Sequence, residues 1–147
     1  IALEKPQDVP TALRSCAAAL AQVEQIARQR PGSREPQLDL VNRHAWLADA
    51  YRASGNGARA RSERLVEQEL LDRLIASAPR NIDLKTQWVS MQRALALLDV
   101  VDGRPKTALA RRTNALAVLN EMVALDPANN EWIKQRRRLK SELFPRS

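Results

Sequence analysis

The chain has few of the residues from which catalytic and metal sites are built. It contains one cysteine, Cys16, and one histidine, His44. A disulfide within the chain is therefore excluded, and no Cys/His set of metal-binding spacing is present. There is neither a glycine-rich phosphate loop nor a Gly-x-Ser-x-Gly sequence. We therefore expect no catalytic residue, no cofactor and no metal ion, and a protein that is not an enzyme.

The reactive side chains that do occur have structural interpretations. Cys16 lies in an alanine-rich run, which favours a small buried residue over a reactive thiol. His44 falls one turn before Leu47 on the packing face of an expected helix, so we predict a partly buried packing or hydrogen-bonding role. The carboxylates are scattered along the chain and are expected to lie on solvated helix faces; they include Asp39, Glu63, Glu67, Asp72 and Glu121.

Aromatic residues make up only 3% of the chain, and there are four glycines. Alanine, leucine, arginine, glutamine and glutamate dominate instead, and these helix formers predict an all-α fold. No apolar run approaches the roughly 18 residues of a membrane span, and no signal peptide is visible. We expect a cytoplasmic location, or a periplasmic one if a longer parent carries a membrane anchor upstream. Because the chain opens with Ile1, we interpret it as part of such a parent.

What the chain does have is one junction that occurs three times at equal intervals. Each junction places a proline, a possible capping residue and an acid at steps of two: Pro31-x-Ser33-x-Glu35, Pro79-x-Asn81-x-Asp83 and Pro127-x-Asn129-x-Glu131. The proline disfavours helical geometry in the residue before it. The Ser or Asn caps a new helix, and the acid opposes the positive end of its dipole. Equal spacing of such junctions predicts a repeat protein.

Apolar residues recur at three- and four-residue steps between the junctions and predict six helices. We expect a disordered lead-in over residues 1–9 and one repeat domain over 10–144. Turn signals at Gly55 and Gly103 divide the central part into helix pairs. The predicted order is a lone helix, two complete helix pairs and a C-terminal capping helix, at 10–30, 34–78, 82–125 and 130–144. Short turns favour antiparallel neighbours.

The stretch from Leu47 to Asn56, followed by Ala60, resembles the tetratricopeptide repeat (TPR). It has the family's large, small and aromatic residues, its turn glycine and the small residue beyond. The unit is longer, at about 48 residues against 34 in the family. In the second copy Asp99 replaces the aromatic residue. HEAT-type repeats, at about 40–47 residues, are the competing interpretation. The resemblance implies a right-handed α-solenoid of about six helices, with long units like those appended to bacterial signalling proteins.

In TPR proteins the first helix of each pair lines a concave groove. The resemblance implies that the groove-facing positions here include Asn42, Asp49, Arg52, Ser90, Arg93, Leu97 and Arg138. The arginines and Asn42 suit an acidic peptide or a C-terminal carboxylate. Trp46 sits beside the apolar stripe of its helix and is a candidate anchor for a partner. Leu97, Val100 and Val101 suggest either extra burial or a contact patch.

The net charge is +7, and residues 127–147 contribute +4 of it. The basic run Lys134 to Lys140 winds around its helix and has no interleaved aromatic residue for base stacking. We interpret it first as the polar face of a terminal repeat, which leaves an anionic partner open. The expected function is a non-catalytic protein or peptide interaction module of a bacterial signalling protein. The alternatives are nucleic-acid binding, and self-association through the uncovered helix 10–30.

Overall fold

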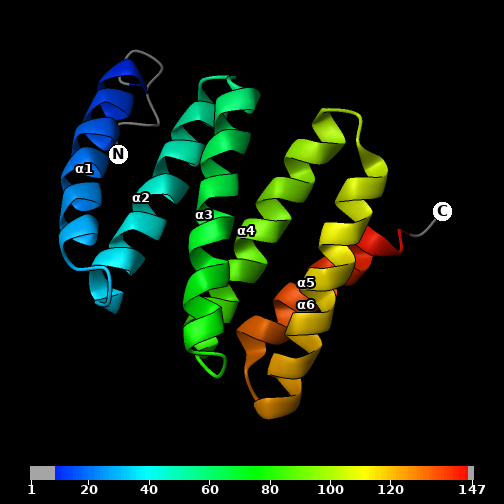
Figure 1. The fold of residues 1–147 in the computed structure, drawn as a ribbon. Helices are drawn as coiled ribbons and strands as arrows, with labels where there is room; N and C mark the ends of the chain where they lie inside the picture. Colours follow the sequence, from blue (N-terminus) through cyan, green and yellow to red (C-terminus); the bar gives the residue numbers. More distant parts are fainter. Residues whose placement is uncertain (1–8, 146–147) are drawn as a thin grey trace. The chain divides into compact units, whose positions relative to one another are not determined.

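The computed structural model describes residues 9–145, and this part of the chain is helical with no strand. Its six helices are α1 (Val9–Gln29), α2 (Arg34–Ala53), α3 (Gly57–Ser77), α4 (Ile82–Val101), α5 (Pro105–Leu125) and α6 (Asn130–Leu143) (Figure 1). The prediction of an all-α fold with six helices is confirmed. The expected lead-in over 1–9 lies outside the described residues, except that Val9 opens α1.

The helix ends follow the equal spacing of the junctions. Helices α1, α3 and α5 begin at positions 9, 57 and 105 and end at positions 29, 77 and 125. Helices α2, α4 and α6 begin at positions 34, 82 and 130. Each series advances by the interval that separates Pro31, Pro79 and Pro127. We call this common interval the repeat frame, and it relates positions such as 44, 92 and 140 in successive copies.

Local chemistry explains the junctions. The side chains of Asn81 and Asn129 each accept a hydrogen bond of 3.1 Å from a backbone N–H in the first turn of α4 and α6. Ser33, at the corresponding place before α2, makes no such bond. The turns that follow α2 and α4 contain Gly55 and Gly103, with φ of +83° and +72°. Only glycine adopts this left-handed conformation without strain, so both turns depend on it.

The chain divides into two compact units, residues 1–79 and residues 80–147, here called the N-unit and the C-unit. In the N-unit, α2 packs against both α1 and α3. Tyr51, near the end of α2, contacts Arg59 near the start of α3, whereas His44 reaches Glu63 further along α3. The buried side chains on α2 and α3 include Val41, Leu47, Ala48, Ala60, Leu71 and Leu74.

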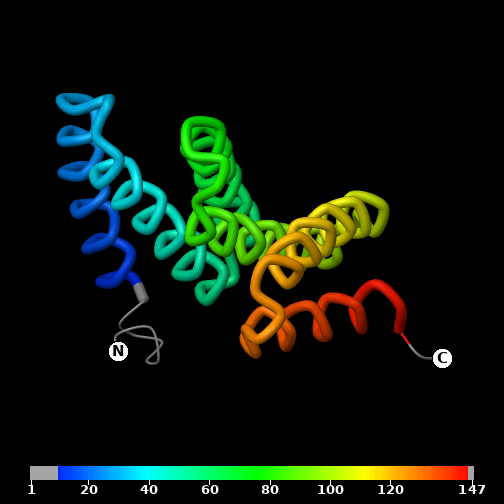
Figure 2. Tube along the Cα trace, turned by 90° about the horizontal axis from the view of Figure 1, so that it is seen from below, coloured from blue at the N-terminus to red at the C-terminus, as the bar shows by residue number. Residues whose placement is uncertain are grey.

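In the C-unit, α5 packs against both α4 and α6 (Figure 2). The buried cluster draws on all three helices and consists of Val89, Ala115, Leu119, Met122 and Leu139. Trp88 and Trp132 are partly buried and pack against this cluster. Small and β-branched residues meet long ones here, which lets the three helices approach closely.

The expected burial of Cys16 and the expected exposure of Glu67 need correction. Cys16 is only partly buried, because among the described helices α1 packs mainly against α2 and its other side stays open. Glu67 was expected on a solvated face but is buried on α3. No helix within residues 9–145 combines the length and apolar character needed to cross a membrane.

Candidate functional site

Helix α2 has one buried face and one exposed stripe. Four of the residues predicted to bind a partner, Asn42, Trp46, Asp49 and Arg52, follow one another at steps of four, three and three, and all are exposed. Residues at this spacing lie along one side of a helix. The opposite side carries the buried Val41, His44, Leu47 and Ala48. The structure therefore presents these four residues together.

Trp46 is the most prominent residue of this stripe, with 62% of its surface exposed. The guanidinium carbon of Arg43 lies 5.9 Å from the centroid of the indole ring, within the range of a cation–π contact. A hollow of about 500 Å³ beside the ring is lined by Asp39, Asn42, Arg43, Ala45 and Trp46. An exposed indole beside a hollow is a feature of protein contact surfaces, where tryptophan often dominates the binding energy.

The charge of Asp49 is largely neutralised within the N-unit. Arg64 on α3 reaches Asp49 Oδ1 with Nη2 at 2.7 Å and Glu67 Oε1 with Nη1 at 2.9 Å. One guanidinium thus bridges an exposed and a buried carboxylate. The other charged residues beside this stripe include Asp39, Arg43 and Arg52, so it offers both signs of charge.

A second polar contact joins α2 to α3. His44 Nδ1 lies 2.6 Å from Glu63 Oε2, and His44 is 7% exposed. The predicted hydrogen-bonding role of His44 is confirmed. Glu63 had been expected on a solvated face, but it points toward α2 and is only partly exposed. A buried imidazole with a carboxylate partner fixes the rotation of α2 relative to α3, because any other rotation leaves both groups unpaired.

Glu67 is the buried carboxylate that Arg64 binds. Burial raises the pKa of its carboxyl group, because the charged form loses water. The cation of Arg64 and its hydrogen bond act in the opposite direction, and the negative charge of Asp49 adds to the rise. The repeat frame contains a signal for these contacts between helices. Glu63 and Arg111 occupy the same position in successive copies, and each pairs with a residue of the preceding helix.

The C-unit carries the other four predicted binding residues. Ser90 and Leu97 on α4 and Arg138 on α6 are exposed. Arg93 is engaged instead, since its Nη2 lies 2.9 Å from Glu142 Oε1 on α6. Leu97 is 54% exposed, and its neighbours Val100 and Val101 are exposed as well. Of the two interpretations of these three apolar residues, the structure favours a contact patch over extra burial.

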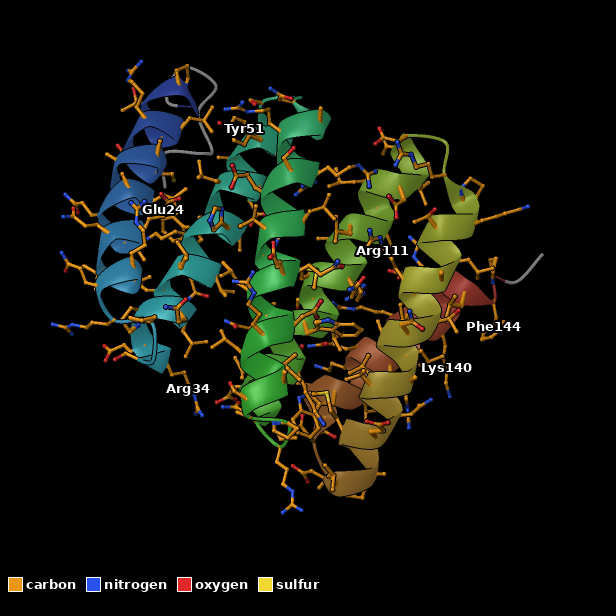
Figure 3. All side chains as sticks on the ribbon, in the orientation of Figure 1. Glu24, Arg34, Tyr51, Arg111, Lys140 and Phe144 are labelled. Carbon is orange, nitrogen blue, oxygen red and sulfur yellow. The ribbon has the colours of Figure 1, made fainter. Side chains whose placement is uncertain are left out.

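The C-unit repeats the polar contact between its hairpin helices with different residues. Arg111, labelled in Figure 3, makes two contacts with α4. Its Nη1 donates to Gln92 Oε1 at 3.0 Å, and its Nε donates to Asp99 Oδ2 at 2.9 Å. In the repeat frame Arg111, Gln92 and Asp99 correspond to Glu63, His44 and Tyr51. Asp99 is fully buried, and Arg111 forms an ion pair with it. The frame therefore extends from the helix ends to the side-chain contacts between helices.

Comparison with known proteins assigns no family: no protein-family model matches the chain, and no curated protein or solved structure does either. Within the described residues, no group of three or more His, Cys, Asp and Glu side chains is placed to hold a metal ion. The candidate binding site around Trp46 on α2 therefore rests on the exposure and geometry of its residues.

Proposed function

We propose that the chain is a non-catalytic helical-repeat module that binds a peptide or a partner domain along the first helices of its pairs. In this proposal the pairs α2–α3 and α4–α5 stack as a right-handed solenoid of the TPR type. Support comes from the residues that resemble that family and from helix ends and inter-helix contacts that recur in the repeat frame. The parent in this proposal is a bacterial signalling protein of the cytoplasm.

One observation carries the binding role, namely the exposed Trp46 beside its hollow. An indole of this exposure lies mostly outside the buried core of the N-unit. The contacts that His44 and Arg64 make between α2 and α3 hold α2 in place before a partner arrives. Preorganisation of this kind lowers the entropic cost of binding.

The charges near Trp46 define the partner chemistry. Asp49 is neutralised by Arg64, and Arg43 and Arg52 remain available to bind a carboxylate. Arginine pairs with carboxylates through two parallel hydrogen bonds. The partner is therefore a peptide segment with an apolar side chain for the hollow and an acidic or C-terminal carboxylate group beside it.

The test is a selection of peptides from a phage-displayed library with free C-termini, using the whole chain as bait. Affinities of the selected peptides are then measured by fluorescence anisotropy for the wild type and for Trp46→Ala. We expect Trp46→Ala to weaken binding by about 30-fold or more, as for a binding hot spot of about 2 kcal/mol. Arg52→Gln should weaken it several-fold.

Leu125→Ala provides the matched control, because Leu125 is a similarly exposed apolar residue on another helix. It should leave every selected peptide bound as before. Selected peptides that bind Trp46→Ala as tightly as the wild type, or a library that yields no specific peptide, contradict the proposal.

A further inference from the structure

Helix α6 departs from α2 and α4 at the positions that those helices bury. In the repeat frame Arg137 corresponds to Val41 and Val89, which are both buried. Lys140 corresponds in the same way to the buried His44 and Gln92. Arg137 and Lys140 are exposed. An apolar helix packed there, as α3 packs on α2, would remove two cations from water without partners, at a high cost. This face of α6 is therefore not suited to packing against a further apolar helix.

The exposed cations of α6 are Lys134, Arg137, Arg138 and Lys140, and together they define the α6 basic face. None of the four forms an ion pair with another of residues 9–145. Three arginines that lie between helices of the C-unit behave differently, since Arg93, Arg111 and Arg112 each lie within 2.9–3.5 Å of a carboxylate oxygen. The structure thus pairs these three arginines and leaves Arg137 and Arg138 of α6 facing solvent.

The charge of α6 exceeds what solubility requires. Exposed charges on α2 have mixed signs, with three acids and two arginines: Arg34, Glu35, Asp39, Asp49 and Arg52. α6 exposes four cations against the single acid Glu131. Residues 80–147 carry 13 Lys/Arg against 7 Asp/Glu, a net charge of +6, whereas residues 1–79 carry 11 against 10. A field of one sign concentrated on one helix attracts a polyanion.

Insertion into a lipid surface does not fit this helix. A helix that lies in a membrane interface must turn an apolar face to the acyl chains. The apolar side of α6 is already used within the C-unit, because Leu139 is fully buried and Trp132 packs against the same cluster. Recognition of a partner by α6 therefore depends on its cations and on any aromatic residue that remains exposed.

We propose that the α6 basic face binds the phosphate backbone of single-stranded nucleic acid. Lys134 and Lys140 are six residues apart, or about 9 Å along the helix, which is enough to reach at least two successive phosphates of one strand. Arg137 and Arg138 offer planar forks that bind phosphate oxygens in pairs. This surface shares no residue with the stripe around Trp46.

Phe144 distinguishes a single strand from a duplex. It follows Lys140 by one turn at the C-terminal end of α6, and 71% of its surface is exposed (Figure 3). An exposed ring beside a cationic surface stacks on unpaired bases, which a duplex does not present. The sequence showed no aromatic residue within the basic run, and the structure shows one at its end.

The test is a fluorescence anisotropy titration of the whole chain with labelled 20-nucleotide oligo(dT) and oligo(U) and with an unrelated 20-base-pair duplex. We expect binding whose log K falls with log salt concentration at a slope of about −2 to −3, as for three or four phosphate contacts on a single strand. Phe144→Ala should weaken single-strand binding several-fold and leave duplex binding unchanged.

The triple variant Lys134→Gln/Arg137→Gln/Arg138→Gln should lose at least 10-fold in single-strand affinity and reduce the slope to about −1 or less. The matched control Arg30→Gln/Arg34→Gln/Arg80→Gln removes the same charge from exposed positions on other segments. It should keep the single-strand affinity and the salt slope of the wild type. Trp46→Ala should also bind as the wild type, so failure here and failure of peptide binding are separate results.

Three outcomes overturn the proposal. The first is the absence of nucleic-acid binding at low salt. The second is an equal loss in the triple variant and its control, which would mean that only net charge matters. The third is equally tight binding of a 20-residue polyglutamate, which would identify the α6 basic face as a surface for acidic proteins. Circular dichroism of each variant confirms that its helices are retained.

Discussion

The hairpins α2–α3 and α4–α5 use the same helix lengths and the same turn glycine, but they join their helices through different polar groups. His44 and Glu63 form the contact in the first hairpin, and Gln92 and Arg111 form it in the second. Both residues of the contact differ between the two hairpins, and the two changes compensate each other. A donor therefore still faces an acceptor in each hairpin. The helix geometry therefore tolerates a change of polar chemistry as long as the pair stays complementary.

The two hairpins also differ in how deeply they bury charge. The second encloses Asp99 completely, where the first has Tyr51 with its hydroxyl toward solvent and Arg59. The first instead buries Glu67, where the second has Ala115 in its apolar cluster. Each hairpin thus holds one buried carboxylate bound by an arginine, at a different position. The more deeply a carboxylate is buried, the larger the loss of stability that we expect when its polar partner is removed.

The largest effect is expected for Arg111→Met, which leaves Asp99 buried without its cation. We expect a loss of about 3–5 kcal/mol in the free energy of unfolding, measured by urea titration with circular dichroism. Glu63→Met in the other hairpin should cost about 1–3 kcal/mol, because it leaves the buried His44 without its carboxylate partner. The double variant Asp99→Leu/Arg111→Met should recover most of the loss. A larger cost for Glu63→Met than for Arg111→Met would reverse the comparison.

Leu71→Ala and Leu119→Ala test whether the apolar cores of the two hairpins are equivalent. Both leucines are fully buried at the same position of the repeat frame. Each substitution should cost about 2–5 kcal/mol through lost burial and a cavity, and thermal and urea unfolding should rank them together. Leu97→Ala, at an exposed position, is the control and should change stability by about 0.5 kcal/mol or less. If only one of the two core variants is costly, the cores are not equivalent.

The helix caps should show a smaller difference. Asn81→Ala removes a hydrogen bond to the first turn of α4 and should cost about 1 kcal/mol. Ser33→Ala removes no side-chain cap bond and should cost only a few tenths of that. Asn81→Asp, which keeps an acceptor, should retain most of the stability in the same urea measurement. Equal losses at Ser33 and Asn81 would show that the two caps act alike.

The smallest expected effect is the pH dependence that Glu67 contributes in the first hairpin. Burial raises the pKa of Glu67, so the folded chain binds its proton more tightly than the unfolded chain does. The contribution of this group is greatest below the ordinary pKa of about 4.5 and is lost as the pH rises through the folded value. Arg64 opposes the shift and limits its size.

Glu67→Gln removes that titration and still accepts a hydrogen bond from Arg64. The difference in unfolding free energy between variant and wild type, followed by urea titration from pH 3.5 to 7.5, should move in favour of the variant as the pH rises. His44 and Asp49 also face Glu67, and they are unchanged in both proteins. A difference that is flat with pH, or that moves the other way, contradicts the assigned direction.

Local signals predicted the helices well because each depends on a few neighbouring residues. The junctions at Pro31, Pro79 and Pro127 mark helix ends through backbone geometry alone. The exposure of Trp46 and the hydrogen bond of His44 were also within reach, because helical spacing assigns each residue to a face. Glu67 was misplaced because helical spacing does not say which face meets another helix, and a carboxylate is usually solvated.

The sequence by itself determined the helical class, the helix ends and the repeat frame, since capping residues, prolines and left-handed glycines act within a few residues of the chain. Only the tertiary structure decided which charges are paired. Arg93 finds Glu142 on α6 and Arg111 finds Asp99 on α4, whereas the cations of the α6 basic face find no carboxylate among the described residues. The reason is that a charge is neutralised by whatever lies within a few ångströms in space, and the packing of whole helices sets that distance.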